Sequence, residues 1–136
     1  MIQTKRPDLV AMVEPKPLRR VLIIDDDPAF VDTLSAMVLS LGFPVTISVD
    51  GRSDHILDLT DDDIVFLDVL MPISSGLQVL DQLAEQKATC AIVLMSGNLE
   101  RLDGAEKYAE NLDLNLIGAL EKPFRLDDVK GVLSIA

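Results

Sequence analysis

The 136-residue sequence has no tryptophan, one tyrosine and four phenylalanines, so a folded core must be built mostly from aliphatic side chains. Its single cysteine, Cys90, excludes an internal disulfide and a cysteine-rich zinc cluster, which favours a cytoplasmic protein. No apolar run approaches the roughly 18 residues of a membrane span, and the first residues lack the apolar centre of a signal peptide. Hydrophobic residues nevertheless make up 49% of the chain, which predicts one globular domain without membrane contact.

Basic residues are also scarce. Lysine and arginine number 12 against 23 aspartates and glutamates, giving a formal net charge of −11. Because proteins bind nucleic-acid phosphates mainly through lysine and arginine, we expect no direct contact with nucleic acid. The one histidine, His55, has no neighbours that suggest catalysis or metal binding, and we interpret it as an exposed helix residue.

Short apolar runs alternate five times with segments of helical periodicity, which predicts an α/β fold with a parallel sheet covered by helices on both faces. The predicted strands are 21–24, 44–49, 64–67, 90–95 and 114–119; the predicted helices are 28–41, 52–59, 75–87, 99–112 and 125–134. Residues 1–18 contain three prolines and are expected to form a flexible tail ahead of one domain spanning 19–136.

Polar side chains follow four of the predicted strands. Asp25 and Asp26 end the first, Asp68 the third, Ser96 the fourth, and Lys122 follows the fifth. Parallel strands joined by right-handed crossovers end at one edge of a sheet, so these side chains should converge there. Asp27 before Pro28 is explained by helix capping alone, but Asp25 and Asp26 are not.

Three carboxylates in one place repel each other unless a cation lies among them. Mg²⁺ suits such a cluster, because it binds one or two carboxylates together with waters and a phosphate oxygen. Asp68 would then face an incoming phosphoryl group, while Lys122 and the Ser96 hydroxyl bind two of its oxygens. This interpretation fails if the Asp68 side chain is buried in an ion pair, or lies more than about the width of a metal site from Asp25 and Asp26.

Four motifs at these strand ends resemble the receiver domain of two-component response regulators, the CheY-like family, and the resemblance covers roughly 19–136. The motifs are Ile24-Asp25-Asp26-Asp27-Pro28, Phe66-Leu67-Asp68-Val69-Leu70-Met71-Pro72, Ser96-Gly97 and Glu121-Lys122-Pro123-Phe124. The resemblance implies a flavodoxin-like (βα)5 fold, a doubly wound parallel sheet with strand order 2-1-3-4-5.

The resemblance further implies that Asp68 accepts a phosphoryl group from a sensor histidine kinase or a histidine phosphotransfer protein. Asp25, Asp26, Asp68 and the backbone carbonyl of Leu70 would bind Mg²⁺, with Mn²⁺ or Ca²⁺ as substitutes. Ser96 and Lys122 would contact the phosphoryl group, and the Lys122–Pro123 peptide bond would be cis. Such a protein catalyses only its own phosphorylation and dephosphorylation, and is otherwise not an enzyme.

A receiver passes its signal on through protein contacts. We expect the output protein or domain to bind the face formed by the helix over 99–112, the strand over 114–119 and the helix over 125–134, with a homodimer as a further partner. The chain departs from the family at Ala119, where a tyrosine or phenylalanine commonly couples to the hydroxyl, and at Ser75, where an acid is frequent. A narrower likeness is to the receivers of cyclic-di-GMP phosphodiesterase regulators.

Two other functions stay open at this point. Ala119 slightly favours a receiver-like adaptor that works without phosphate, although the complete set of acids, Ser96 and Lys122 argues against it. A small phosphohydrolase with an aspartyl-phosphate intermediate would need a second acid two residues after Asp68, where the chain has Leu70. FMN binding is disfavoured, because no hydroxyl-rich phosphate loop follows the first strand.

Overall fold

A computed structural model describes residues 19–49, 54–70 and 76–136 of the chain. The predicted flexible tail over 1–18 lies outside these residues. So do Met71, Pro72 and Ser75, the last a position where the family frequently has an acid.

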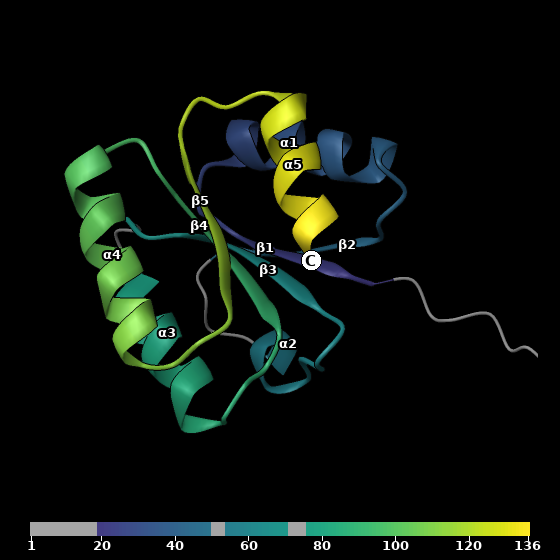
Figure 1. The fold of residues 1–136 in the computed structure, drawn as a ribbon. Coiled ribbons are helices and arrows are strands. Elements are labelled where there is room, and N and C mark those ends of the chain that lie inside the picture. Colours follow the sequence, from purple (N-terminus) through teal and green to yellow (C-terminus); the bar gives the residue numbers. More distant parts are fainter. Residues whose placement is uncertain (1–18, 50–53, 71–75) are drawn as a thin grey trace, which may run out of the picture.

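The described chain folds as five strands that alternate with five helices (Figure 1). The elements are β1 (Val21–Ile24), α1 (Pro28–Ser40), β2 (Val45–Ser48), α2 (Asp54–Leu57), β3 (Ile64–Asp68), α3 (Gly76–Glu85), β4 (Ala91–Ser96), α4 (Leu99–Asn111), β5 (Leu116–Glu121) and α5 (Leu126–Ile135). All strand pairs are parallel, in the order β2-β1-β3-β4-β5. This is the flavodoxin-like fold and strand order expected from the sequence.

The helices cover the two faces of the sheet unequally. Figure 1 shows α1 and α5 on one face and α2, α3 and α4 on the other. Two separate apolar clusters fill the spaces between helices and sheet, one on each face. The central strands β1, β3 and β4 are buried on both faces, which is why their sequences are continuous apolar runs rather than alternating ones.

Strand register determines which side chains meet at the carboxyl edge of the sheet. Ile24, the last residue of β1, lies beside Leu67 of β3, so the next residues, Asp25 and Asp68, emerge side by side. Asp68 itself lies beside Met95, one residue before Ser96. The predicted convergence therefore follows directly from the pairing of three buried strands.

The last strand begins two residues later than the sequence suggests. The prediction of 114–119 was wrong because the apolar run starts with Leu114, which packs against the core from a turn rather than from a strand. Asp113 in this turn has a left-handed backbone, with φ of 59°. The shift matters for the site, because β5 now ends at Glu121 and places Lys122 directly beyond the carboxyl edge.

The second strand and second helix also differ from expectation. Strand β2 is shorter than the predicted 44–49, and its alternation of apolar and polar residues does not match burial: Val45 packs against the core, but Ile47 is 41% exposed and Ser48 is buried. This strand lies at the edge of the sheet. Helix α2 ends at Leu57, two residues before the predicted end at 59, and the Leu57 side chain is 63% exposed. The side chain of His55 lies outside the described residues.

Across the described ranges, none of the helices has the length and apolar character needed to cross a bilayer.

Gly76 is required by close packing against the strand that carries Asp68. A Cβ atom at Gly76 would lie 2.6 Å from the Cα of Val69 and 2.9 Å from the carbonyl oxygen of Asp68. Real side chains do not approach a backbone that closely, so helix α3 can start here only with glycine. The end of β3 is thereby held against the first turn of α3.

We predict that Gly76→Ala lowers the free energy of unfolding by about 1–3 kcal/mol, because backbone atoms must move to admit the methyl group. The matched control is Gly104→Ala, in the middle of α4, where a Cβ would meet nothing within 4 Å. That change should raise stability by about 0.5–1 kcal/mol, since alanine favours helix. Urea denaturation measures both, and equal effects of the two variants would contradict the packing argument.

Candidate functional site

The three acids predicted to cluster do so. Asp25, Asp26 and Asp68 each offer one carboxylate oxygen, and these three oxygens lie within 4.8 Å of one another. Asp25 is fully buried and Asp68 is 5% exposed, whereas Asp26 is half-buried. Oxygen ligands at this spacing fit a hard divalent cation, which would neutralise charges that otherwise repel.

Lys122 supplies positive charge to this cluster from the loop after β5. Its Nζ donates a hydrogen bond of 2.7 Å to Oδ2 of Asp25 and lies 3.5 Å from Oδ2 of Asp68. The sequence assigned Lys122 to an incoming phosphoryl group and did not anticipate its pairing with Asp25. The Lys122–Pro123 bond is cis, as the family resemblance implied.

Asp68 is buried and pairs with Lys122, the arrangement that the sequence interpretation counted against phosphorylation, but this pair is longer than that of Lys122 with Asp25. Burial raises the pKa of Asp68 from the ordinary 3.8 to about 6, and the positive charge of Lys122 and the backbone N–H of Leu70 lower it only in part. The negative charge of Asp25 adds to the increase. Lys122 makes its short hydrogen bond with Asp25, so Asp68 keeps an incompletely neutralised oxygen facing the cluster.

Ser96 and Leu70 hold the positions that the sequence predicts at the strand ends. Ser96 is fully buried at the end of β4, where its hydroxyl oxygen accepts a hydrogen bond of 3.0 Å from the backbone N–H of Asn98. The hydroxyl proton therefore stays available for another acceptor. The backbone N–H of Leu70 donates to Oδ1 of Asp68 at 3.2 Å, which tethers the loop after β3 to the proposed acceptor.

The start of α1 brings two further residues, Asp27 and Phe30, to the site. Asp27 caps the helix by accepting from the backbone N–H groups of Ala29 and Phe30, as predicted. The backbone N–H of Asp27 donates to Oδ1 of Asp25 at 3.0 Å, which orients that carboxylate. The ring of Phe30 faces Lys122, with Nζ 4.1 Å from the ring centroid. No motif in the sequence gave Phe30 a role at this site.

Comparison with known proteins agrees with this geometry. The family model described as "Response regulator receiver domain" matches residues 21–134. The chain belongs to the response regulator receiver family. As a receiver domain it is part of two-component signalling, in which response regulators interact with histidine kinases and output domains.

Individual relatives show the same relationship. The transcriptional regulatory protein CpxR of Escherichia coli is 32% identical over 111 residues, which cover 79% of this chain and 44% of CpxR. The cell cycle transcriptional regulator CtrA of Caulobacter vibrioides is 32% identical over 81% of this chain and 46% of its own length. The receiver therefore spans less than half the length of these curated relatives.

Solved structures also resemble the receiver. A response regulator from Colwellia psychrerythraea has a TM-score of 0.78 and 32% identity, covering 88% of this chain and 97% of the other. TrrA from Thermotoga maritima, solved in complex with Mg²⁺-BeF, has a TM-score of 0.72, with 87% of this chain and 98% of the other covered. At 21% identity the TrrA comparison shows the fold alone.

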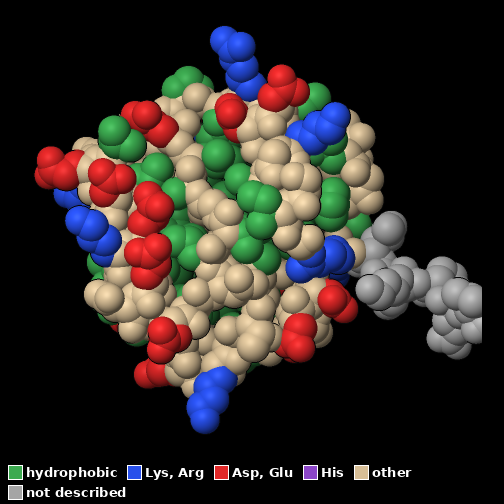
Figure 2. Space-filling view, in the orientation of Figure 1, with side chains coloured by type: hydrophobic (Ala, Val, Ile, Leu, Met, Phe, Trp, Pro, Cys, Tyr) green, Lys and Arg blue, Asp and Glu red, His purple; other side chains and the backbone are tan. Residues whose placement is uncertain are grey.

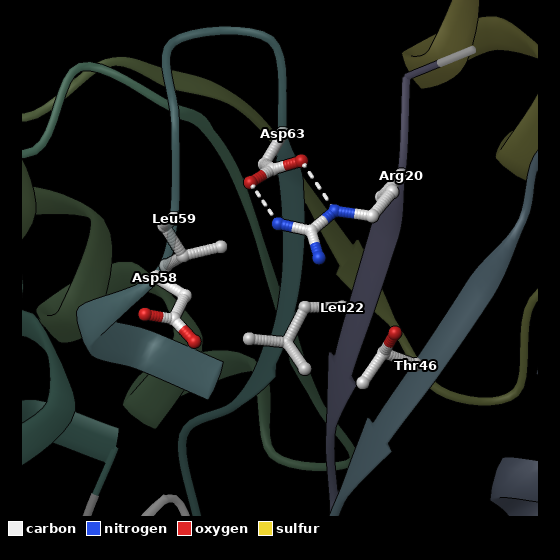
Figure 3. Close-up of a pocket in the computed structure, with 6 residues that line it drawn as sticks. All are labelled: Arg20, Leu22, Thr46, Asp58, Leu59 and Asp63. Atoms are coloured by element: carbon white, nitrogen blue, oxygen red, sulfur yellow. Dashed lines mark hydrogen bonds and ion pairs between the residues drawn. The ribbon is translucent and has the colours of Figure 1, made fainter. Parts of the chain in front are cut away.

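A small hollow lies at the amino edge of the sheet, opposite the carboxylate cluster (Figure 3). It has a volume of about 30 Å³, enough for roughly one water molecule, and Arg20 and Asp63 face each other at its rim. Arg20 donates to both carboxylate oxygens of Asp63, at 3.1 and 2.8 Å. Burial alone would raise the pKa of Asp63, but the hydrogen bonds from Arg20 and Thr60 hold it below its ordinary value. This satisfied pair stabilises the fold and differs in kind from the carboxylate cluster.

We predict that Asp68→Asn stabilises the receiver in Mg²⁺-free buffer at neutral pH. The folded pKa of Asp68 lies above its unfolded value, so ionising Asp68 destabilises the fold, fully above pH about 6 and not at all below about pH 4. The gain should be about 1–3 kcal/mol at pH 8 and should vanish toward pH 4.

Urea denaturation across this pH range measures the gain. Asp113→Asn, at an exposed left-handed position that asparagine tolerates, is the control and should give no such pH-dependent gain. A gain for Asp68→Asn that is independent of pH would contradict the proposed cost of ionising this carboxyl.

Proposed function

We propose that this receiver accepts a phosphoryl group on Asp68, from the phosphohistidine of a sensor kinase or phosphotransfer protein, in a Mg²⁺-dependent reaction. The observation that carries the proposal is the cluster of Asp25, Asp26 and Asp68 within 4.8 Å, with Lys122 against it. A stable ion-pair network would leave each charge satisfied, as Arg20 and Asp63 are. Asp68 instead retains a raised pKa beside a group that can stabilise added negative charge.

In the proposed reaction, an Oδ atom of Asp68 attacks the phosphorus atom. An O–P bond forms, the N–P bond to the donor imidazole breaks, and the imidazole leaves after taking up a proton. Dephosphorylation reverses the gain at Asp68: water attacks the phosphorus, inorganic phosphate leaves, and the carboxylate is restored. Both steps need in-line positioning and neutralised charge more than any further covalent chemistry.

We assign that task to Lys122, to Ser96 and to the residues that would hold the cation. Lys122 would exchange its 3.5 Å approach to Asp68 for a bond to a phosphoryl oxygen, and the Ser96 hydroxyl would donate to another. Asp25, Asp26, Asp68 and the Leu70 carbonyl would hold Mg²⁺, with Mn²⁺ or Ca²⁺ as substitutes. The cation, when bound, neutralises charge that accumulates on the phosphoryl oxygens. Asp25 remains hydrogen-bonded to the backbone N–H of Asp27, which keeps its carboxylate oriented.

We further propose that the face formed by α4, β5 and α5 carries the signal to an output protein or domain, or to a second copy of the chain. Lys122 directly follows β5, and its backbone N–H donates to the carbonyl of Ser96 at 2.8 Å, so the site and this face share a backbone connection. Figure 2 shows apolar side chains between α4 and α5, flanked by acidic side chains over α4. The exposed acids Glu100, Asp103 and Glu110 belong to that helix.

The alternatives fit less well. A phosphate-independent adaptor would not require three acids within 4.8 Å of one another and a lysine against two of them. A phosphohydrolase would need an acid–base residue near Asp68, yet the side chain two residues on is that of Leu70, which is 50% exposed. The curated relatives are regulators of transcription, and the matched region covers less than half of their length, so the absence of nucleic-acid contacts by this chain stays a prediction.

We predict that incubation with acetyl phosphate and Mg²⁺ adds the mass of one phosphoryl group. The added group should be absent in Asp68→Asn, which lacks the nucleophilic carboxylate, and strongly reduced in Lys122→Met, which lacks the neutralising ammonium. Intact-protein mass spectrometry measures the gain. Asp113→Asn at the opposite edge of the sheet should be labelled like the wild type, and labelling of Asp68→Asn to the same extent would reject the acceptor.

We predict that Mg²⁺ raises the melting temperature of the wild type and not of an Asp25→Asn, Asp26→Asn double variant. A ligand that binds only the folded state stabilises it by about 2.7 kcal/mol at a free concentration of 100 times its dissociation constant. Thermal unfolding monitored by circular dichroism, with and without Mg²⁺, provides the measurement. An equal Mg²⁺ response from both proteins would place the cation elsewhere.

A further inference from the structure

The ammonium of Lys122 has a third neighbour besides the two carboxylates. Its Nζ lies 4.1 Å from the centroid of the Phe30 ring, close enough for a cation–π interaction. Phe30 is contributed by the first turn of α1, far from Lys122 in the sequence. Asp27 caps that turn, and its own backbone N–H donates to Asp25. The helix start therefore positions both a carboxylate and an aromatic ring around one lysine.

The orientation of the ring is itself controlled. Phe124 packs edge-on against Phe30, with the ring centroids 5.3 Å apart and the ring planes at 84°. Edge-to-face packing is a favoured aromatic geometry, and it limits how far the Phe30 ring can tilt. Phe124 lies two residues after Lys122, so one short segment provides the cation and the ring that fixes its aromatic neighbour.

We propose that Phe30 is a positioning residue for Lys122: the ring holds the ammonium between Asp25 and Asp68, where a phosphoryl oxygen would bind. This role rests on the proposed function and assigns Phe30 a part in it. An ammonium has three N–H groups. One donates to Asp25, the approach to Asp68 accounts for a second, and the ring occupies a side that water would otherwise hydrate.

Contact with an aromatic ring suits a lysine that must change hydrogen-bond acceptors. The interaction with a ring is not directional in the way of a hydrogen bond, so Lys122 can shift from Asp68 toward a phosphoryl oxygen without leaving the ring. The lysine side chain is 18% exposed, so the ring also limits the water that competes for it. Ala119, where relatives commonly carry an aromatic residue, packs with the cluster on the other face of the sheet and does not provide this contact.

The competing explanation is that Phe30 only fills the core, because it packs against the cluster between α1, α5 and the sheet. Replacing Phe30 with a ring-trifluorinated phenylalanine separates the two roles. Fluorination keeps the shape of the ring close to that of phenylalanine but removes the negative potential of its face, on which cation–π attraction depends. Phe30→Leu removes the ring altogether, and Phe30→Tyr preserves its face.

The first measurement is the rate of phosphorylation by acetyl phosphate in the presence of Mg²⁺. We expect the trifluorinated ring and Phe30→Leu to slow it by about three- to tenfold, and Phe30→Tyr to restore most of the rate. In a Lys122→Met background, fluorination should have no further effect. A trifluorinated protein that reacts like the wild type, or one slowed equally without Lys122, would overturn the proposal. Trifluorination of Phe43, a half-buried member of the same apolar cluster, is the matched control.

The second measurement does not depend on phosphorylation. Protons next to the Lys122 ammonium should show an upfield ring-current shift in nuclear magnetic resonance spectra, retained in Phe30→Tyr and lost in Phe30→Leu. Absence of that difference would overturn the positioning role. If the wild type takes up no phosphoryl group while the ring-current difference is present, the proposed function fails and the Phe30–Lys122 contact stands, so the two failures are distinguishable.

Discussion

Repulsion among three carboxylates within 4.8 Å is the constraint around which the carboxyl edge of the sheet is organised. Each of these groups would be better solvated apart, and the buried parallel strands force them together. One ammonium, that of Lys122, partly compensates, with its short hydrogen bond made to Asp25 rather than to Asp68. The division leaves one carboxyl group, Asp68, with a pKa raised to about 6. A cluster of incompletely neutralised carboxylates is well suited to bind a cation, and with it a phosphoryl group.

Apolar packing and a satisfied ion pair elsewhere in the described fold offset the cost of this repulsion. The central strands are fully buried, their helices pack on both faces, and the pair of Arg20 and Asp63 satisfies its charges at the opposite edge. The ion pairs at the two edges of the sheet leave their carboxyl groups with pKa values shifted in opposite directions. At the amino edge, hydrogen bonds lower the pKa of Asp63 below its ordinary value; at the carboxyl edge, burial raises that of Asp68. Strongly shifted pKa values are common at functional sites.

Two chain segments connect the site to the rest of the receiver. The start of α1 orients Asp25 through a backbone N–H and presents Phe30 to Lys122. The segment after β5 carries Lys122 and Phe124, and its backbone is hydrogen-bonded to Ser96. Lys122 therefore joins the site to the end of β5, and Phe124 joins it to the segment that leads into α5. This gives the proposed output face a physical link to Asp68.

The sequence by itself determined the strand and helix order, the parallel sheet and the convergence of Asp25, Asp26, Asp68, Ser96 and Lys122, because buried strands and helix caps leave local patterns. It failed for the start of β5, where Leu114 packs against the core from outside the strand, and for the ends of β2, which is shorter than predicted. Only the tertiary structure decided that Lys122 bonds Asp25 and lies over Phe30. The physical reason is that these contacts join residues nearly a hundred positions apart, whose distance depends on strand register and helix placement rather than on any local pattern.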